Sequence, residues 1–410
     1  MAGRHDRRLR YGANYVPSQG WFHSWLDFSA DAVRRDFADL AGLGLDHVRV
    51  FPIWPWIQPH RGLLRQRPID DLLTLIELAA EFELAVAVDL VQGHLSSFEF
   101  LPPWVLTWHQ RSVFADREVR DGLADYVRRV SEAVGAHPNT FAITLGNEVD
   151  NLWPANPTTP SESRDWAAEL LGVVREAAPR PLALHSLYDA TWYAPEHPYR
   201  PADAVELGDL TTVHSWVFNG VSAIDGPLGP ATTSHAAYLT ELAAATASDP
   251  ARPVWLQEVG VPRPDVPAGD AAEFVRRTLH AVAPNPALYG ITWWASHDID
   301  RALLDFPDRE YDLGLFTVDH QRKPAARAYA EFIADGDVSP ARERPALVAP
   351  CDPRTTPDRR AELAPGSDFH TEWVRRNQQR PTAIVTPDHA GDAGYLAARG
   401  IELPATAERP

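Results

Sequence analysis

The chain has 410 residues, of which 45% are hydrophobic and 23% are charged, and its formal net charge at pH 7 is −18. This length and apolar content allow a large buried core, which excludes a disordered protein or a minimal scaffold, and the acidic balance argues against a nucleic-acid partner. One lysine, Lys323, and one cysteine, Cys351, exclude a phosphate-binding P-loop, a disulfide within the chain and a multi-cysteine metal site.

The first residues, MAGRHDRRLRYGANY, are positively charged but lack the apolar stretch of a secretory signal, and no segment has the length of a membrane span. We therefore expect a cytoplasmic protein with no membrane partner. The sequence does not indicate an oligomeric state.

Short β-like segments alternate with amphipathic helical segments along the chain, which is typical of a parallel sheet covered by helices. The expected strands are 9–15, 47–52, 84–90, 141–147, 181–187, 210–214, 253–258 and 290–295. The expected helices include 29–43, 69–82, 117–136, 161–178, 234–245 and 269–283. Eight strands in this alternation predict an α/β fold, a (β/α)8 TIM barrel.

The loops that follow the expected strands are long and aromatic, as in 91–115 and 188–206, whereas those that precede strands are short. A barrel of this type places its active site among the former, so they mark the functional face. We predict a catalytic barrel over residues 1–335. Residues 336–410, with strand-like pieces at 346–349 and 382–386, are expected to form a small α/β extension that packs on the barrel or is partly disordered.

Two glutamates stand at the ends of expected strands: Glu148 in FAITLGNEVD and Glu258 in PVWLQEVG. A carboxyl group at the end of an apolar strand faces a cavity, where burial penalises its ionised form and suits it to acid/base chemistry. Two such groups can divide glycoside hydrolysis into protonation of the leaving oxygen and attack at the anomeric carbon. The alternative is that each glutamate caps a helix or pairs with an arginine.

With these motifs, about the first 335 residues resemble a clan A retaining glycoside hydrolase, most like glycoside hydrolase family five. In that clan an Asn-Glu pair after the fourth strand supplies the acid/base, and a glutamate after the seventh supplies the nucleophile. The resemblance assigns these positions to Asn147 with Glu148, and to Glu258.

Other positions follow the family pattern. Arg49 in HVRVFP resembles the arginine that keeps the nucleophile ionised, because an adjacent cation lowers a carboxylate's pKa. His94 in VDLVQGH resembles a histidine on the substrate side, and His214 in TVHSW resembles one near the nucleophile. Trp216 stands where the family usually has a tyrosine. Because an indole cannot reproduce a phenolic hydroxyl, we expect another group to donate that hydrogen bond, or Trp216 to form part of the subsite wall.

Tryptophans are frequent in the expected loops. In GITWWASHD, neighbouring residues of a strand face opposite sides, so we expect Trp294 as a sugar platform and Trp293 in the core. Others follow strands, and their concentration favours a carbohydrate cleft, although each one alone is more typical of packing: Trp21, Trp25, Trp54, Trp56, Trp104, Trp108, Trp153 and Trp192.

The resemblance implies a retaining β-glycosidase that uses no metal or cofactor and takes an oligosaccharide or β-glycoside as substrate. Lack of a secretion signal and long aromatic loops favour an exo-acting β-mannosidase on short β-mannosides. The alternatives are an endo-β-1,4-mannanase or β-1,4-glucanase, a non-catalytic carbohydrate-binding barrel, and a metal-dependent barrel hydrolase that uses His297, Asp298 and Asp300 of HDID.

Overall fold

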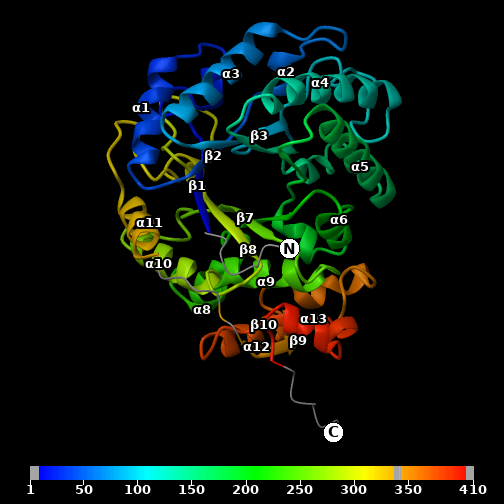
Figure 1. Ribbon diagram of the computed structural model, residues 1–410, viewed down its shortest axis with the longest axis vertical. Helices are drawn as coiled ribbons and strands as arrows, with labels where there is room; N and C mark the ends of the chain where they lie inside the picture. The colour runs from blue at the N-terminus through cyan, green and yellow to red at the C-terminus, as the bar shows by residue number, and fades with distance from the viewer. Residues whose placement is uncertain (1–8, 337–340, 342, 403–410) are drawn as a thin grey trace.

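The centre of the structure is a sheet of eight parallel strands that curves into a nearly closed barrel (Figure 1). The computed structural model describes residues 9–336, 341 and 343–402. The strand order is β5-β4-β3-β2-β1-β8-β7-β6, so the first and the last strand of the barrel are paired side by side. The predicted (β/α)8 barrel is therefore confirmed.

Each predicted barrel strand is present, with ends that shift by a few residues. The strands are β1 (Arg10–Asn14), β2 (His47–Val50), β3 (Ala85–Gln92), β4 (Thr140–Asn147), β5 (Leu182–Leu184), β6 (Thr211–Ser215), β7 (Val254–Val259) and β8 (Leu288–Trp293). The helices are α1 (Ala30–Ala41), α2 (Trp54–Ile57), α3 (Gln66–Glu81), α4 (Arg117–Gly135), α5 (Pro160–Ala177), α6 (Pro201–Glu206), α7 (Ser222–Asp225), α8 (Pro230–Thr233), α9 (His235–Thr246), α10 (Ala271–Val282), α11 (Pro324–Asp335), α12 (Asp368–Asn377) and α13 (Ala393–Ala398).

Helix α1 illustrates how the local sequence determines the covering layer. The side chain of Ser29 accepts a hydrogen bond from the backbone N–H of Ala32 at 3.3 Å and so caps the helix. Val33, Phe37 and Leu40 recur at helical spacing and are buried against the sheet. None of the described helices is both long and apolar enough to cross a membrane.

The C-terminal segment forms a second, two-stranded parallel sheet from β9 (Ala346–Val348) and β10 (Ala383–Val385), flanked by α12 and α13. It lies below α9 in Figure 1. Every residue of α9 is buried, because the barrel covers one face of this helix and the C-terminal segment covers the other. Two tyrosine hydroxyls join the parts: Tyr238 donates to Leu363 O at 2.6 Å, and Tyr395 donates to Ala247 O at 2.8 Å.

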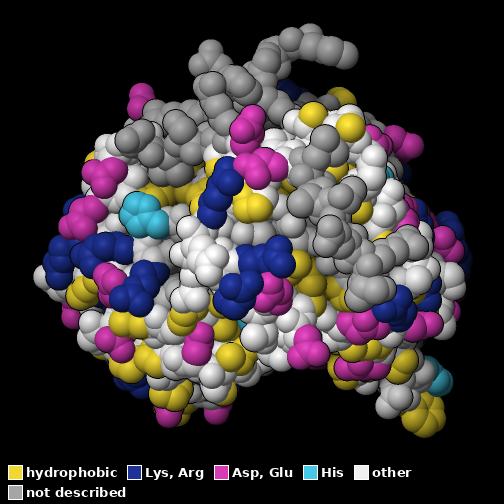
Figure 2. All heavy atoms as spheres, turned by 90° about the horizontal axis from the view of Figure 1, so that it is seen from below, with side chains coloured by type: hydrophobic (Ala, Val, Ile, Leu, Met, Phe, Trp, Pro, Cys, Tyr) yellow, Lys and Arg dark blue, Asp and Glu magenta, His cyan; other side chains and the backbone are white. Residues whose placement is uncertain are grey.

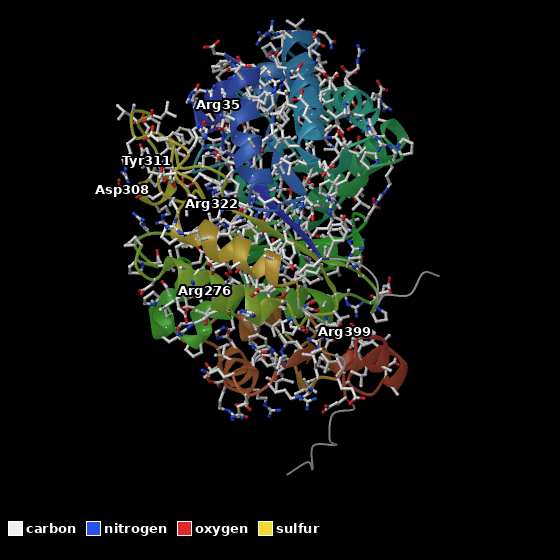
Figure 3. The ribbon with its side chains drawn as sticks, turned by 60° about the vertical axis from the view of Figure 1, so that its left-hand side comes forward. Arg35, Arg276, Asp308, Tyr311, Arg322 and Arg399 are labelled. Carbon is white, nitrogen blue, oxygen red and sulfur yellow. The ribbon has the colours of Figure 1, made fainter. Side chains whose placement is uncertain are left out.

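A buried ion cluster lies in the same junction. The Glu241 carboxylate on α9 pairs with Arg344 and, at 3.4 Å, with Arg399, which Figure 3 shows between the C-terminal helices and the barrel. All three side chains are at most 4% exposed. On the outer face of this end of the molecule, acidic and basic side chains are instead interspersed (Figure 2).

The Glu241→Ala variant should lose about 3–5 kcal/mol of unfolding free energy, because it leaves two guanidinium groups buried without their carboxylate. Urea unfolding measures the change. Glu81→Ala, which removes an exposed partner of Arg34, is the matched control and should change the free energy far less. Equal, small effects would show that the junction contributes little to stability.

Candidate active site

A cavity of about 440 Å³ opens at the carboxyl ends of the barrel strands. Its walls come from segments at or after β3, β4, β5, β6, β7 and β8, which is where the predicted functional face lies. The lining residues are His94, Ser96, Ser97, Asn147, Glu148, Asn151, Tyr188, Trp216, Phe218, Glu258, Trp294, Pro307, Arg309 and Glu310.

The cavity brings the two glutamates together, although 110 residues separate them in the chain. Glu258 belongs to β7, and Glu148 follows β4 with a left-handed backbone (φ 44°) that turns its side chain out of the strand. One carboxylate oxygen of each, together with a ring nitrogen of His214, lie within 4.8 Å of one another. A carboxyl separation near 5 Å is typical of retaining glycosidases, whereas inverting enzymes need about 6.5–9.5 Å.

The fully buried guanidinium of Arg49 forms the floor of the site. It donates to Glu258 Oε1 at 2.8 Å and to Asn147 Oδ1 at 2.5 Å. Two further N–H groups donate to the Asp89 carboxylate at 3.0 and 2.5 Å, and Asn14 Oδ1 accepts another at 3.0 Å. A rigid fork that bonds residues of four other strands, β1, β3, β4 and β7, holds Glu258 in one orientation.

His214 lies between the two glutamates. Its Nδ1 is 2.6 Å from Glu148 Oε1 and 3.3 Å from Glu258 Oε2, while its Nε2 is 3.1 Å from Gln257 Oε1. Burial lowers the pKa of His214, which favours a neutral ring. A neutral ring with its proton on Nε2 leaves Nδ1 free to accept a proton from a carboxyl group.

Trp216 corrects one expectation. The indole Nε1–H donates to Glu258 Oε2 at 3.2 Å, so Trp216 itself supplies the hydrogen bond that was expected from another group. The ring also lines the cavity wall. The indole can take this role because its ring N–H is a hydrogen-bond donor.

Burial dominates the ionisation of both glutamates. The pKa of Glu148 rises to about 8 through burial and the nearby charge of Asp189. Burial also raises the pKa of Glu258, to about 7, against the lowering effects of His214 and Arg49. Arg49 lowers the pKa of Glu258 as expected, but the cost of desolvation exceeds the attraction of the guanidinium, so the pKa is raised overall.

The remaining predicted site residues also lie at the cavity. His94 lines it, and its backbone carbonyl accepts a hydrogen bond from the Asn147 side-chain amide at 2.5 Å. Trp294 is part of the wall, whereas Trp293 is fully buried on the other side of the strand, 5.7 Å from the ring of Tyr329.

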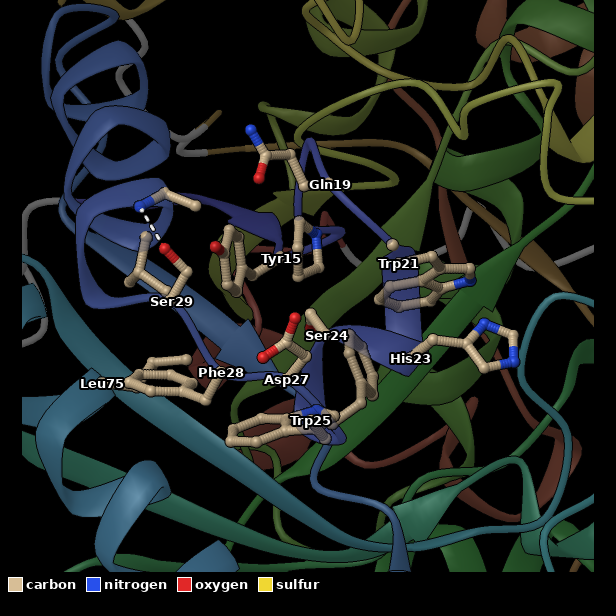
Figure 4. A pocket seen from close by; sticks show the side chains of 15 residues that line it. Tyr15, Gln19, Trp21, His23, Ser24, Trp25, Asp27, Phe28, Ser29 and Leu75 are labelled. Carbon is tan, nitrogen blue, oxygen red and sulfur yellow. Dashed lines mark hydrogen bonds between the residues drawn. The ribbon is translucent and has the colours of Figure 1, made fainter.

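The eight other tryptophans singled out from the sequence do not line this cavity. Trp54 and Trp192 are completely buried in the core, and Trp108 is 90% exposed. Trp21 and Trp25 line a second pocket of about 180 Å³ between the turn 21–25 and α1, shown in Figure 4, which holds neither glutamate. None of the eight therefore contributes to the wall of the cavity that holds the two glutamates.

Several polar lining residues were not predicted, among them Glu310 and Asn151. Glu310 lies in the long segment after β8, and burial raises its pKa to about 7. Asn151 donates to Glu148 Oε2 at 2.9 Å from the turn after β4. The segment around Glu310 has no strand end or motif that would mark it, whereas Asn151 lies one turn beyond the Asn-Glu pair and could have been noticed.

The residues of HDID do not converge. Lys323 Nζ lies 2.6 Å from Asp298, Asp300 caps a local turn, and His297 faces α1. In the cavity, Glu148, His214 and Glu258 have metal-like spacing, but all four carboxylate oxygens there already face protein hydrogen-bond partners. A cation would have to displace those contacts.

No protein-family model and no curated protein matches the sequence. Among solved structures, a Glu-to-Ala variant of a GH5_18 protein from Streptomyces cattleya, in complex with Manβ1-4GlcNAc, is 46% identical with a TM-score of 0.91 and covers 96% of this chain and 98% of its own. A GH5_18 variant from Bifidobacterium longum subsp. longum, with the same ligand, is 36% identical with a TM-score of 0.92 and covers 98% and 96%. An exo-β-1,4-mannosidase from an Opitutaceae bacterium, 24% identical with a TM-score of 0.77 over 95% and 72%, shares the fold.

The Trp216→Phe variant should raise the pKa of Glu258 by about 1 or more, because it removes a hydrogen bond to the charged carboxylate. Carbon NMR of labelled glutamate measures the titration. Trp294→Phe is the control, since that indole lines the same cavity and makes no hydrogen bond to Glu258 among the described residues. An equal shift in both variants would mean that the Trp216 bond does not stabilise the carboxylate.

Proposed function

The chain belongs to glycoside hydrolase family 5, in its subfamily GH5_18, and we propose that it hydrolyses β-mannosides with retention of configuration. The observation that carries the proposal is the close approach of the Glu148 and Glu258 carboxyl groups inside one sugar-sized cavity. Carboxyl groups about 5 Å apart are typical of enzymes in which the second carboxylate attacks the anomeric carbon directly.

In the first step, Glu258 attacks the anomeric carbon while Glu148 protonates the departing glycosidic oxygen. Arg49 and Trp216 hold the two oxygens of Glu258 and favour its ionised form. Glu148, whose pKa is the higher of the two, begins protonated and shares its proton with Nδ1 of His214.

In the second step, Glu148 is a carboxylate and removes a proton from water, which attacks the glycosyl-enzyme and releases the sugar. Loss of the negative charge on Glu258 in the intermediate lowers the pKa of Glu148, because the two groups no longer repel each other. The same residue can therefore donate a proton in one step and accept one in the next.

For the substrate, we infer a short β-mannoside with mannose at its non-reducing end, cleaved in exo fashion. Two solved relatives, 46% and 36% identical to this chain, hold Manβ1-4GlcNAc. The preferred bond is therefore that between mannose and N-acetylglucosamine. An endo-β-1,4-mannanase or glucanase is the alternative, and a binding barrel without activity is disfavoured by the paired glutamates.

The pH dependence of kcat/KM should be bell-shaped. Activity requires ionised Glu258, so it rises as the pH passes about 7, and it requires protonated Glu148, so it falls as the pH passes about 8. With a dinitrophenyl β-mannoside, whose leaving group needs no proton, the alkaline limb should disappear. An alkaline limb that is unchanged with this substrate would remove Glu148 from the acid role.

Glu258→Gly should lower kcat by about 10⁴-fold or more with the fold intact, since no nucleophile remains. Added azide should then give α-mannosyl azide from an aryl β-mannoside, whereas in Glu148→Ala it should give the β-azide. The exposed Glu77→Ala is the control and should retain full activity. Azide products of the opposite configuration would exchange the two roles.

Product analysis tests the substrate. Manβ1-4GlcNAc should be split into mannose and N-acetylglucosamine with a higher kcat/KM than mannobiose, and mannan polymer should yield only single mannose units. Mixed long oligomers from the polymer would contradict exo action and support the endo-acting alternative.

A further inference from the structure

Four side chains meet where the first and the last βα units of the barrel adjoin. Asp36 and Asp39 project from α1, His297 follows β8, and His320 lies in the turn before α11. Figure 3 labels Arg322 in the same region, where its guanidinium donates to Gly42 O at 3.1 Å and ties that turn to the end of α1. None of the four lines the cavity that holds the two glutamates.

One ligand atom from each of Asp36, His297 and His320 lies within 4.8 Å of the other two, and Asp39 contacts both histidines. His297 Nε2 is 3.3 Å from Asp39 Oδ2 and 3.7 Å from Asp36 Oδ1, and His320 Nδ1 is 3.9 Å from Asp36 Oδ1. Ligand atoms at about 2.0–2.1 Å from a tetrahedral zinc ion lie about 3.3 Å from one another. Two of these contacts are hydrogen bonds, from His320 Nδ1 to Asp39 Oδ2 at 2.7 Å and from His297 Nε2 to Asp39 Oδ2 at 3.3 Å, and a metal would take the place of the shared protons.

Asp36 supplies an independent observation. The side chain is completely buried, and its Oδ2 accepts hydrogen bonds from the Tyr15 hydroxyl at 2.8 Å and from the Ser18 N–H at 3.1 Å. Its other oxygen, Oδ1, has no hydrogen-bond partner within the described residues and faces His297 and His320. A buried carboxylate oxygen without a partner requires a positive group nearby.

The ring of His297 is fixed in the orientation of a ligand. Ser296 Oγ donates its only proton to Val16 O at 2.8 Å, so at 3.2 Å from His297 Nδ1 it can act only as an acceptor. Nδ1 of the ring therefore donates to Ser296 Oγ, and Nε2 faces the carboxylates of Asp36 and Asp39. An outer hydrogen bond of this kind is what orients metal-bound histidines.

We propose that Asp36, Asp39, His297 and His320 bind one divalent transition-metal ion, with zinc as the best fit to two carboxylates and two imidazoles. The ion would join α1 to the segments that follow β8 and so fasten the barrel where its first and last units meet. The competing account is that a proton on His297 neutralises the carboxylates and no metal binds.

The test is zinc titration of the full chain after dialysis against a chelator, followed by calorimetry and by metal analysis of the dialysed complex. One zinc per chain and a raised Tm are expected, with a four-coordinate visible spectrum when cobalt(II) replaces zinc. Less than one metal per chain at saturation would overturn the proposal in favour of the protonated cluster.

Variants place the ion. His320→Ala and Asp39→Asn change partly exposed side chains, so the fold should persist. Loss of a residue that only orients a ligand weakens metal binding by about 10- to 100-fold, and each of these variants should weaken zinc binding by more than that. His109→Ala, which changes an exposed histidine elsewhere, should bind zinc as the parent does. Unchanged affinity in His320→Ala would put the ion at another site and contradict the proposal.

Discussion

The buried charge of Arg49 is the constraint on which the catalytic end of the barrel depends. A guanidinium with no exposure to solvent costs several kcal/mol unless its donors are satisfied by acceptors and its charge is balanced. Asp89 supplies the balancing carboxylate, and Asn14, Asn147 and Glu258 accept the remaining bonds. Because these partners come from β1, β3, β4 and β7, the polar ends of strands that are distant in the chain are held in a fixed arrangement.

The arrangement around Arg49 also gives the two glutamates different pKa values. Both are desolvated in the same cavity, and burial raises the pKa of both. Glu258 lies against Arg49, which lowers its pKa, whereas the nearby charge of Asp189 raises that of Glu148 further. The neighbouring charges therefore favour one group as the carboxylate and the other as the acid.

The barrel fold and the position of its catalytic site could be predicted from the sequence because both depend on local residue patterns. Apolar strands that end in Arg49, Glu148 and Glu258 identify both the barrel and the position of its site, since parallel strands in a barrel end on one face. Contacts between segments that are distant in the sequence could not be predicted from local pattern. The hydrogen bond from the Trp216 indole to Glu258 depends on how β6 and β7 pack, and the raised pKa of Glu258 depends on its burial in the folded chain.

The environments of the tryptophans and the position of the C-terminal segment also could not be predicted from local sequence. An aromatic residue after a strand is consistent with either a sugar platform or the core, and only packing decides between them, as it does for Trp54 and Trp192. The C-terminal strands were foreseeable from their apolar runs. Their position against α9 was not, because it depends on Tyr238, Glu241 and Tyr395 meeting partners more than 100 residues away.

A covalent bond between Glu258 and the sugar requires that hydrolysis retain the anomeric configuration. Proton NMR of the first mannose released from an aryl β-mannoside tests this directly, before the sugar mutarotates. We expect β-mannose to appear first and α-mannose later. If α-mannose appears first, water attacks the substrate directly, and the assignment of Glu258 as nucleophile is wrong.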